Sequence, residues 1–195
     1  MIGAALYLIL AYLIGAIPTG YLIAKQLKGI DIREHGSGNV GSTNVRRVVG
    51  KKAGYTTLVL DFLKGLIAVS GAKILFHDPQ QIVPVLAGVA AVIGHSRSVF
   101  IGFKGGKSVI TSSGVIFALE PWPAIILTGL AFVVIKLTRY VSIGSLLSAI
   151  LLPVAIWLAH GPLSHLVLAG FICIYVIYLH RGNIDRLIHH QENRI

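Results

Sequence analysis

The N-terminal stretch MIGAALYLILAYLIGAIPTGYLIA, residues 1–24, contains no charged side chain. An α-helix needs about 20 apolar residues to cross a bilayer, so this stretch predicts a membrane span. No basic residue precedes Lys25, so the stretch lacks the charged start of a signal peptide and we expect it to be retained. Of the 195 residues 12% are charged, against about 25% in a soluble domain. We therefore expect an all-α integral membrane protein with a single polytopic domain over residues 1–195.

Six further stretches with few or no charges follow, which makes seven expected transmembrane helices. They cover residues 55–72, 79–94, 108–119, 121–135, 140–159 and 161–179. The stretch at 108–119 is short, because a helix of that length rises about 18 Å against a hydrocarbon core of about 30 Å. It either extends into the preceding loop or returns together with the next helix as a re-entrant hairpin.

Basic residues gather on one side of this expected topology. With the N-terminus outside, every one of the 17 lysines and arginines except Lys64 and Lys73 falls on the inner side. Cytoplasmic loops carry an excess of Lys and Arg. We therefore expect an outside N-terminus and a cytoplasmic C-terminus. The net charge of +10 follows from this asymmetry and does not indicate a nucleic-acid partner.

The first inner loop, HGSGNVGSTNVRRVVGKKAG at residues 35–54, is rich in Gly, Ser, Asn and Thr. These residues permit turns with positive φ and expose backbone N–H groups. A short helix capped by Ser42 or Thr43, running through Val49 and ended by Gly50, would offer its N-terminus to an anion. Arg46 and Arg47 would point about 100° apart on it, so only one can readily face a site. The same composition also fits a plain linker.

The second inner loop is GHSRSVFIGFKGGKSVITSSG, residues 94–114. It departs from the nucleotide-binding pattern GxxxxGK[ST], because its lysine comes one residue early. It still combines close-approach glycines with two lysines ahead of an expected helix, an arrangement that suits a phosphate. These residues are Gly102, Gly105, Gly106, Lys104 and Lys107.

The third polar stretch is YLHRGNIDRLIHHQENRI, residues 178–195, where the seventh expected helix ends. His180 and Asn183 are three residues apart, so on a helix or turn they share a face and can contact one substrate. An interfacial role for His180 is the plainer alternative. Because all three stretches favour phosphate oxygens on one membrane face, they predict a substrate that joins a phosphate to an apolar tail.

Two charges also fall inside an expected span. Asp61 and Lys64 are at i and i+3, so they lie on one helix face and can neutralise each other. Charges at this depth usually pair or line a polar cavity. We expect a structural ion pair beneath the first loop.

At these residues the chain resembles the bacterial acyl-phosphate:glycerol-3-phosphate acyltransferases, the PlsY family, over essentially its full length. The resemblance rests on GSGNVGSTNVRR, GHSRSVFIGFKGGK, DFLKG and HRGNIDRLIHHQE. It implies that an acyl group passes from acyl phosphate to the 1-hydroxyl of glycerol 3-phosphate, giving lysophosphatidic acid and inorganic phosphate, the first acylation of phospholipid synthesis. It also implies a bacterial inner-membrane protein with a cytoplasmic active site.

The resemblance and the charge pattern together assign roles to three groups of residues. The expected catalytic residues are Ser37, Arg47, Lys104, His180 and Asn183. The expected substrate-binding residues are Gly38, Asn39, Asn44, Gly102, Gly105, Gly106 and Lys107, and the resemblance implies that the three glycines Gly102, Gly105 and Gly106 serve glycerol 3-phosphate binding. The expected structural residues are Asp61, Lys64 and Glu192. Two departures from the family pattern are Ser42, where alanine is usual, and Ser108, where glycine is common; neither removes a required group.

The expected partners are acyl phosphate, glycerol 3-phosphate, membrane lipid and, through a functional link, a soluble enzyme that forms acyl phosphate. No metal or cofactor is expected, because no group of histidines or carboxylates has ligand spacing and Cys173 is the single cysteine.

Three alternatives remain open. The proton of the attacking hydroxyl can go to His180 or to a substrate phosphate oxygen. HRGNID also fits H-x4-D, with His180 and Asp185, the signature of acyl-CoA-dependent acyltransferases. An organic-phosphate transporter is the rival of a different class, although no internal repeat is visible.

Overall fold

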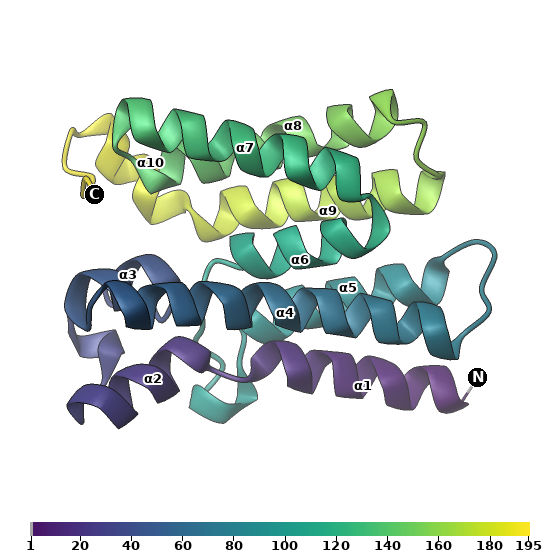
Figure 1. Cartoon of the computed structure of the whole chain (residues 1–195), viewed down its shortest axis with the longest axis horizontal. Coiled ribbons are helices and arrows are strands. Elements are labelled where there is room, and N and C mark those ends of the chain that lie inside the picture. The colour runs from purple at the N-terminus through teal and green to yellow at the C-terminus, as the bar shows by residue number, and fades with distance from the viewer. Residues whose placement is uncertain (1) are drawn as a thin grey trace. The chain divides into compact units, whose positions relative to one another are not determined.

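In the computed structural model, which describes residues 2–195, every regular element is a helix (Figure 1). The elements are α1 (Ile2–Ala16), α2 (Thr19–Lys28), η1 (Ile32–Glu34), α3 (Ser42–Val48), α4 (Lys51–Leu75), α5 (Ile82–Ser96), η2 (Val99–Ile101), α6 (Val109–Leu119), α7 (Pro121–Thr138), α8 (Val141–Leu158), α9 (Leu163–Leu179) and α10 (Arg181–Ile188), where η marks a 3-10 helix. The chain divides into two compact units, one up to Ala118 and one from Leu119 onward. The expected all-α class is confirmed.

The first unit is built on α1, α4 and α5, which pack against one another (Figure 1). Small side chains make this close approach possible, as is usual where helices meet in a membrane. The buried cluster between them consists of Tyr7, Ala11, Ala68, Ala72, Ala87 and Ala91. The Tyr7 hydroxyl donates a hydrogen bond to the Ala68 carbonyl at 2.8 Å, so this aromatic side chain also links α1 to α4.

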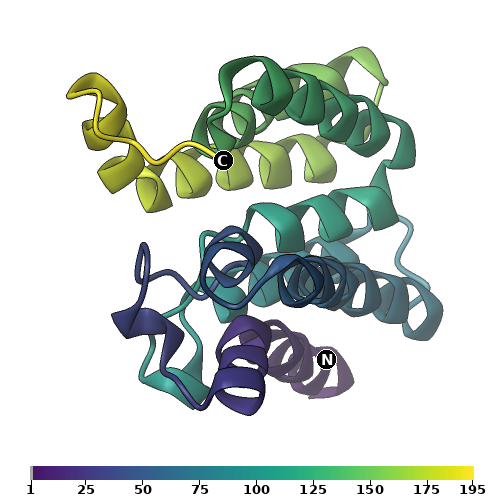
Figure 2. The same cartoon turned by 60° about the vertical axis from the view of Figure 1, so that its left-hand side comes forward.

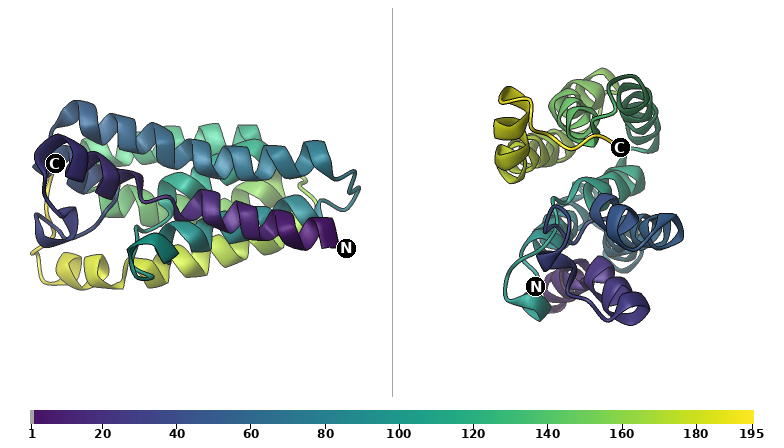
Figure 3. Two further views of the ribbon diagram at one scale, coloured as in Figure 1. Left: turned by 90° about the horizontal axis from the view of Figure 1, so that it is seen from below. Right: turned by 90° about the vertical axis from the view of Figure 1, so that its left-hand side faces the viewer.

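The stretch expected to form one helix at residues 1–24 is broken at Ile17 and Pro18 (Figure 3). Pro18 has no backbone N–H and disfavours helical geometry at the residue before it, so α1 ends at Ala16 and α2 starts at Thr19. The two helices together, Ile2–Lys28, remain long and apolar enough to form one span. The break exposes backbone carbonyls inside the unit, and polar side chains from other helices bind them.

The second unit contains α7, α8 and α9, with α8 packed against both of the others. α10 follows α9 after a bend of 57° (Figure 2). The tail beyond α10 folds back within this unit, where the Ile195 N–H donates to the Arg139 carbonyl at 3.0 Å. The bend and the returning tail place the third polar stretch at one end of the unit.

Four helices of the described residues are long and apolar enough to cross a membrane, or five if α9 and α10 form one span. These candidate spans are Ile2–Lys28, Ile82–Ile101, Pro121–Thr138 and Val141–Leu158, with Leu163–Leu179 plus Arg181–Ile188 as the bent pair. α4 carries Asp61, Lys64 and Lys73 and is not among them, and α6 is a shorter apolar helix. The chain is therefore an integral membrane protein, and the expected number of seven spans stays a prediction.

Candidate active site

Asn44 organises the first polar loop. Its side chain is buried, and its Oδ1 accepts the Ser37 backbone N–H at 2.9 Å. Its Nδ2 donates to the carbonyls of His35 and Asn39, each at 2.9 Å. The side-chain amide of Asn44 thus holds the loop together, and Ser37 is exposed at the surface of the loop. Asn44 was expected to bind substrate. Its hydrogen bonds instead fit a residue that holds the loop, and direct contact with substrate stays a prediction.

The short helix after this loop, α3, is confirmed with one difference. It begins at Ser42, and Gly41 is its N-cap with no side-chain cap hydrogen bond. The backbone N–H of Gly41 is instead bound by the Asn39 side chain at 2.8 Å. At the other end, the Lys28 ammonium donates to the Val48 carbonyl at 2.6 Å. A cation at a helix C-terminus is favourable, so α3 is held to α2.

The two arginines of α3 face different surroundings, as their spacing predicts. Gly54 of α4 lies so close to Arg46 that a side chain on Gly54 would collide with its Cα and Cβ. The backbone and Cβ of Arg46 therefore lie on the face of α3 that packs on α4, and Arg47 lies about 100° around the helix; both residues are exposed. Ser37 and Lys104 are exposed as well, and Lys107 is half-buried. The first unit thus presents polar and cationic groups from both loops at its surface.

Arg33 joins the first loop to the second. Its guanidinium forms a bidentate pair with Asp31, with Nη2 at 2.6 Å from Oδ2, and its Nη1 donates to the Ile101 carbonyl at 3.2 Å. It also lies over the Tyr21 ring. The hydrogen bonds from Arg33 and its positive charge lower the pKa of Asp31 to about 2. This cluster ties η2 to the segment that leads into the first loop.

An apolar cluster holds the same two loops together from beneath. It contains Ala24, Ile32, Val40, Val45, Ala53 and Ile101, so side chains from both polar loops share one core. The loops therefore lie at the same end of the first unit, at the end opposite the start of α1 (Figure 1). The structure thus brings the first and second sequence motifs together within the first unit.

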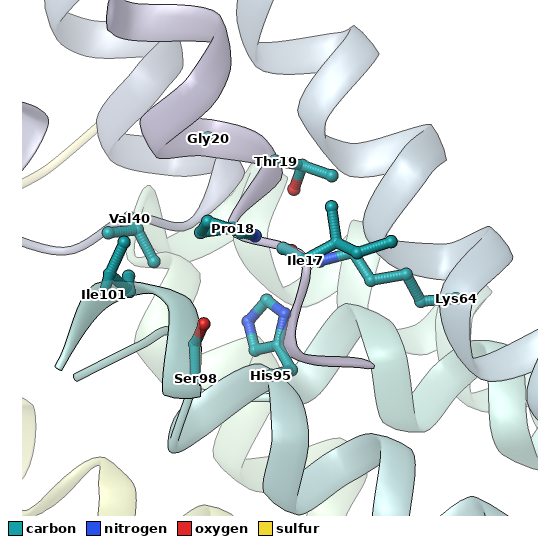
Figure 4. A pocket seen from close by; sticks show the side chains of 9 residues that line it. All are labelled: Ile17, Pro18, Thr19, Gly20, Val40, Lys64, His95, Ser98 and Ile101. Carbon is teal, nitrogen blue, oxygen red and sulfur yellow. Dashed lines mark hydrogen bonds between the residues drawn. The ribbon is translucent and has the colours of Figure 1, made fainter. Parts of the chain in front are cut away.

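The expected Asp61–Lys64 pair is present and buried. Lys64 Nζ lies 2.6 Å from Asp61 Oδ1, and it also donates to the Ile17 carbonyl at 2.7 Å. The Thr19 hydroxyl donates to the same Asp61 oxygen. The pair therefore binds both sides of the α1–α2 break, at a narrow crevice (Figure 4). Its lining residues are Ile17, Pro18, Thr19, Gly20, Val40, Lys64, His95, Ser98 and Ile101.

Thr19, His95 and Ser98 also belong to this cluster and were not predicted from the sequence. Ser98 is buried and donates to the Ala16 carbonyl, and His95 Nδ1 lies 3.7 Å from Asp61 Oδ1. The one local signal for them was the proline at position 18, since a broken helix leaves carbonyl groups that need donors. Which distant side chains supply those donors follows from tertiary packing alone.

The third polar stretch forms a compact hydrogen-bonded group in the second unit. Glu192 Oε1 accepts from Asn183 Nδ2 at 2.6 Å and from the Ser142 hydroxyl at 3.0 Å, and Arg186 Nε binds Oε2 at 2.8 Å. Burial alone would raise the pKa of Glu192, but these three donors outweigh it and hold the pKa below its ordinary value. Glu192 thus binds the Asn183 side chain, and its structural role stays a prediction.

His180 is buried at the end of α9, and its Nδ1 lies 2.8 Å from the Val176 carbonyl. A carbonyl oxygen only accepts hydrogen bonds, so Nδ1 is the donor in this contact, and in the neutral form of the ring the lone pair is on Nε2. Asp185 does not orient this ring. It is exposed, and its Oδ1 lies 3.4 Å from His189. The H-x4-D pattern therefore does not form a His–Asp pair here.

Among residues 2–195, no three His, Cys, Asp or Glu side chains gather as a set of metal ligands. The groups available for binding in the first unit are hydroxyls, backbone amides and cations, and those in the second unit are an imidazole and an amide. Such groups bind and orient a phosphate ester and accept or position a hydroxyl proton. They suit group transfer between anionic substrates.

Comparisons with known proteins agree with this chemistry. Residues 5–190 match the family model described as glycerol-3-phosphate acyltransferase. A glycerol-3-phosphate acyltransferase from Bacillus velezensis is 46% identical, with 98% of this chain and 97% of that protein covered. One from Rippkaea orientalis is 43% identical, with 98% and 93% covered.

Solved structures show the same likeness. The chain is similar to the crystal structure of PlsY, an integral membrane glycerol 3-phosphate acyltransferase, in its glycerol 3-phosphate form. The TM-score is 0.92 at 42% sequence identity, and the match covers 99% of this chain and 96% of that one. The lysophosphatidic acid form gives a TM-score of 0.90 at the same identity. These likenesses define an integral membrane acyltransferase of phospholipid synthesis. Within that class, the chain belongs to the glycerol-3-phosphate acyltransferase family.

Proposed function

We propose that this acyltransferase takes its acyl group from acyl phosphate and passes it to the 1-hydroxyl of glycerol 3-phosphate. The attacking oxygen forms a bond to the acyl carbon, the bond from that carbon to the phosphate oxygen breaks, and phosphate leaves with the electron pair. The products are lysophosphatidic acid and inorganic phosphate. The observation that carries the proposal is the joining of two polar, lysine- and arginine-bearing loops by Arg33 and Ile101 at one end of the first unit.

The main difficulty of this reaction is charge. Two phosphate groups, each carrying up to about −2 near neutral pH, have to be held close together. Arg47, Lys104 and Lys107 offset that charge, and they continue to offset it as it moves onto the departing phosphate. Ser37 acts as a hydrogen-bond donor to phosphate. A labelled acyl group trapped on Ser37 after a rapid quench would contradict that role.

Two acceptors for the hydroxyl proton remain, Nε2 of His180 and an oxygen of a substrate phosphate. If His180 is the base, His180→Asn lowers kcat by about 10²–10⁴-fold. If His180 only positions the hydroxyl, the loss is about one hydrogen bond, roughly 2- to 13-fold for 0.5–1.5 kcal/mol. Single-turnover rates over a range of pH distinguish the two cases, with Asp185→Asn as a control at an exposed site of the same stretch.

The donor itself is tested by supplying purified protein in detergent with glycerol 3-phosphate and either palmitoyl phosphate or palmitoyl-CoA. We expect lysophosphatidic acid and phosphate from the first donor only. Turnover with the CoA thioester alone would favour the H-x4-D alternative. Phosphate release in detergent, where no compartment exists, also separates acyl transfer from transport.

We further propose seven spans in one membrane domain of the bacterial inner membrane, with the N-terminus outside and both loops in the cytoplasm. The support is the distribution of lysine and arginine. Cys173 is the single native cysteine, so Cys173→Ser gives a cysteine-free background. Single cysteines placed at Ser37 and at Gln80 should label from opposite sides of the membrane. Labelling of both from one side would contradict this topology.

An acyl phosphate is a reactive mixed anhydride, so a cytoplasmic active site would receive it from a soluble enzyme that forms it. We propose a functional link of that kind. Supplying such an enzyme with its own substrates, in place of added acyl phosphate, should sustain turnover.

A further inference from the structure

Gly102, Gly105 and Gly106 of the second loop are required for different reasons. Gly102 has φ 71°, a left-handed conformation that favours glycine, and open space surrounds the position of a Cβ there. A Cβ at Gly105 would strike backbone atoms of His95 and Ser96. At Gly106 the three nearest atoms all belong to the imidazole ring of His95. Contacts within the protein therefore require glycine at positions 105 and 106.

His95 lies in the last turn of α5, directly beneath this loop. Its carbonyl accepts the Gly106 N–H at 3.1 Å, while its ring lies against Gly106 and lines the crevice at the α1–α2 break (Figure 4). Its Nδ1 is 3.7 Å from Asp61 Oδ1, and the side chain is 8% exposed. One residue thus contacts the loop by both its backbone and its side chain.

We propose that His95 is a positioning residue for the phosphate-binding loop, and that Gly106 is glycine because of the His95 ring and not because a ligand approaches its backbone. The ring sets the height of the loop above α5. The loop in turn sets where Lys107 enters the site. The inference rests on the proposed role of this loop in holding glycerol 3-phosphate, and it reaches that substrate only through the loop.

A double-mutant cycle of His95→Ala and Gly106→Ala tests this, because the two residues contact each other. A methyl group at Gly106 collides with the ring, so Gly106→Ala alone should raise the KM for glycerol 3-phosphate at least tenfold. His95→Ala removes all three of the nearest obstacles. The double variant should therefore have a KM at least fivefold below the product of the two single effects. The KM for palmitoyl phosphate should change less than twofold in each variant.

Gly105 provides the matched control. A methyl group at Gly105 meets backbone atoms, which His95→Ala leaves in place. The effects of Gly105→Ala and His95→Ala on the KM for glycerol 3-phosphate should therefore multiply, and His95→Ala should not rescue Gly105→Ala. His165 provides a second control, because it is another buried histidine beside a carboxylate, with Nδ1 at 2.8 Å from Glu120 Oε1. His165→Asn should leave the KM for glycerol 3-phosphate unchanged.

Two results overturn the proposal. Equal damage by Gly106→Ala with and without His95 would mean that the glycine serves the ligand directly. A lower melting temperature for His95→Ala with an unchanged KM would mean a purely structural role. His95→Asn, which keeps a planar polar group in less volume, replaces the alanine variant if that one fails to fold. Failure of the proposed reaction is recognised separately, as absence of turnover by the unmodified protein.

Discussion

The two buried carboxylates that hold the polar loops, Asp61 and Glu192, are neutralised in different ways. Asp61 lies on α4, which is expected to be a span, and its cation Lys64 is on the same helix at 2.6 Å. Glu192 lies in the C-terminal tail and receives hydrogen bonds from Asn183, Arg186 and Ser142. A charge in a membrane helix needs a partner of opposite sign close by. Glu192 also pairs with a cation, Arg186 at 2.8 Å, but its three partners come from two different helices, α8 and α10.

The difference teaches what each carboxylate contributes. Lys64 reaches past Asp61 to the Ile17 carbonyl, so the ion pair fixes a break in the backbone under the first two loops. Glu192 holds Asn183 and Arg186 of a single motif, together with Ser142 of α8. Removing one partner at Asp61 should therefore affect the whole first unit, and removing Glu192 should affect the tail and the reaction.

Lys64→Ala should have the largest effect, because it leaves Asp61 buried without its cation. We expect a loss of about 3–5 kcal/mol in unfolding free energy. Unfolding in detergent, followed by tryptophan fluorescence, measures it. Lys73→Ala on the same helix is the control, because Lys73 is exposed and should cost about 0–1 kcal/mol.

An apolar pair, Asp61→Leu with Lys64→Met, sharpens this prediction. Replacing both partners of a buried pair is often far less damaging than removing one. The double variant should therefore be more stable than Lys64→Ala. If it is less stable, the pair matters mainly through its hydrogen bonds to Thr19 and Ile17, and the contrast with Glu192 weakens.

Glu192→Ala should have the next largest effect. It leaves the buried Asn183 amide and the Ser142 hydroxyl without their acceptor, which costs about 1–3 kcal/mol. Because Asn183 then loses the hydrogen bond that Glu192 accepts, kcat should fall by more than the stability loss explains. Asp185→Ala, at an exposed carboxylate of the same stretch, should leave both quantities unchanged. A stability loss as large as that of Lys64→Ala would remove the distinction between the two carboxylates.

The pH dependence of Glu192 follows from its depressed pKa. A carboxylate with a folded pKa below its ordinary value of 4.5 stabilises the fold above that value, and the stabilisation is lost as pH falls through the folded pKa. The melting temperature of the unmodified protein should exceed that of Glu192→Gln at pH 7. The difference should shrink as the pH is lowered below about 4.5. A difference that grows on acidification would contradict the hydrogen-bonding pattern.

The same contrast shows what sequence reasoning can reach. The i, i+3 spacing predicts the Asp61–Lys64 pair correctly, because helix geometry alone brings those side chains together. The spacing does not predict that Thr19 binds Asp61 or that Lys64 binds the Ile17 carbonyl, because these contacts join separate segments of the chain. The family resemblance indicates a structural role for Glu192, but its bond to Ser142 joins segments 50 residues apart.

The break between α1 and α2 was not predicted, for a different reason. Pro18 was visible in the sequence and its effect on the preceding residue is general, yet the apolar run around it dominated the interpretation. Asn44 was predicted to bind substrate because a polar side chain in a polar motif favours a role in binding, and His95 was given no role. The structure indicates that both hold a loop, through Oδ1 and Nδ2 of Asn44 and through the ring and carbonyl of His95.

Ser108 should give the smallest effect, and it supplies the neutral reference for the comparison. It has φ 60°, a left-handed conformation that costs a non-glycine residue about 1–2 kcal/mol, which gives a physical reason for glycine being common at this position. Its hydroxyl donates to the Val92 carbonyl at 2.8 Å, a bond worth about 0.5–1.5 kcal/mol. Ser108→Gly removes both terms, so unfolding free energy should change by less than about 1 kcal/mol.

Ser108→Ala is the matched variant, because it loses the hydrogen bond and keeps the strained backbone. It should therefore be less stable than Ser108→Gly, by about 1 kcal/mol. Both variants act on one buried neutral hydrogen bond in the same unit as Asp61. If either one destabilised the protein as much as Lys64→Ala, any buried polar contact in this unit would be equally critical. The large effect expected at Asp61 would then not come from its charge.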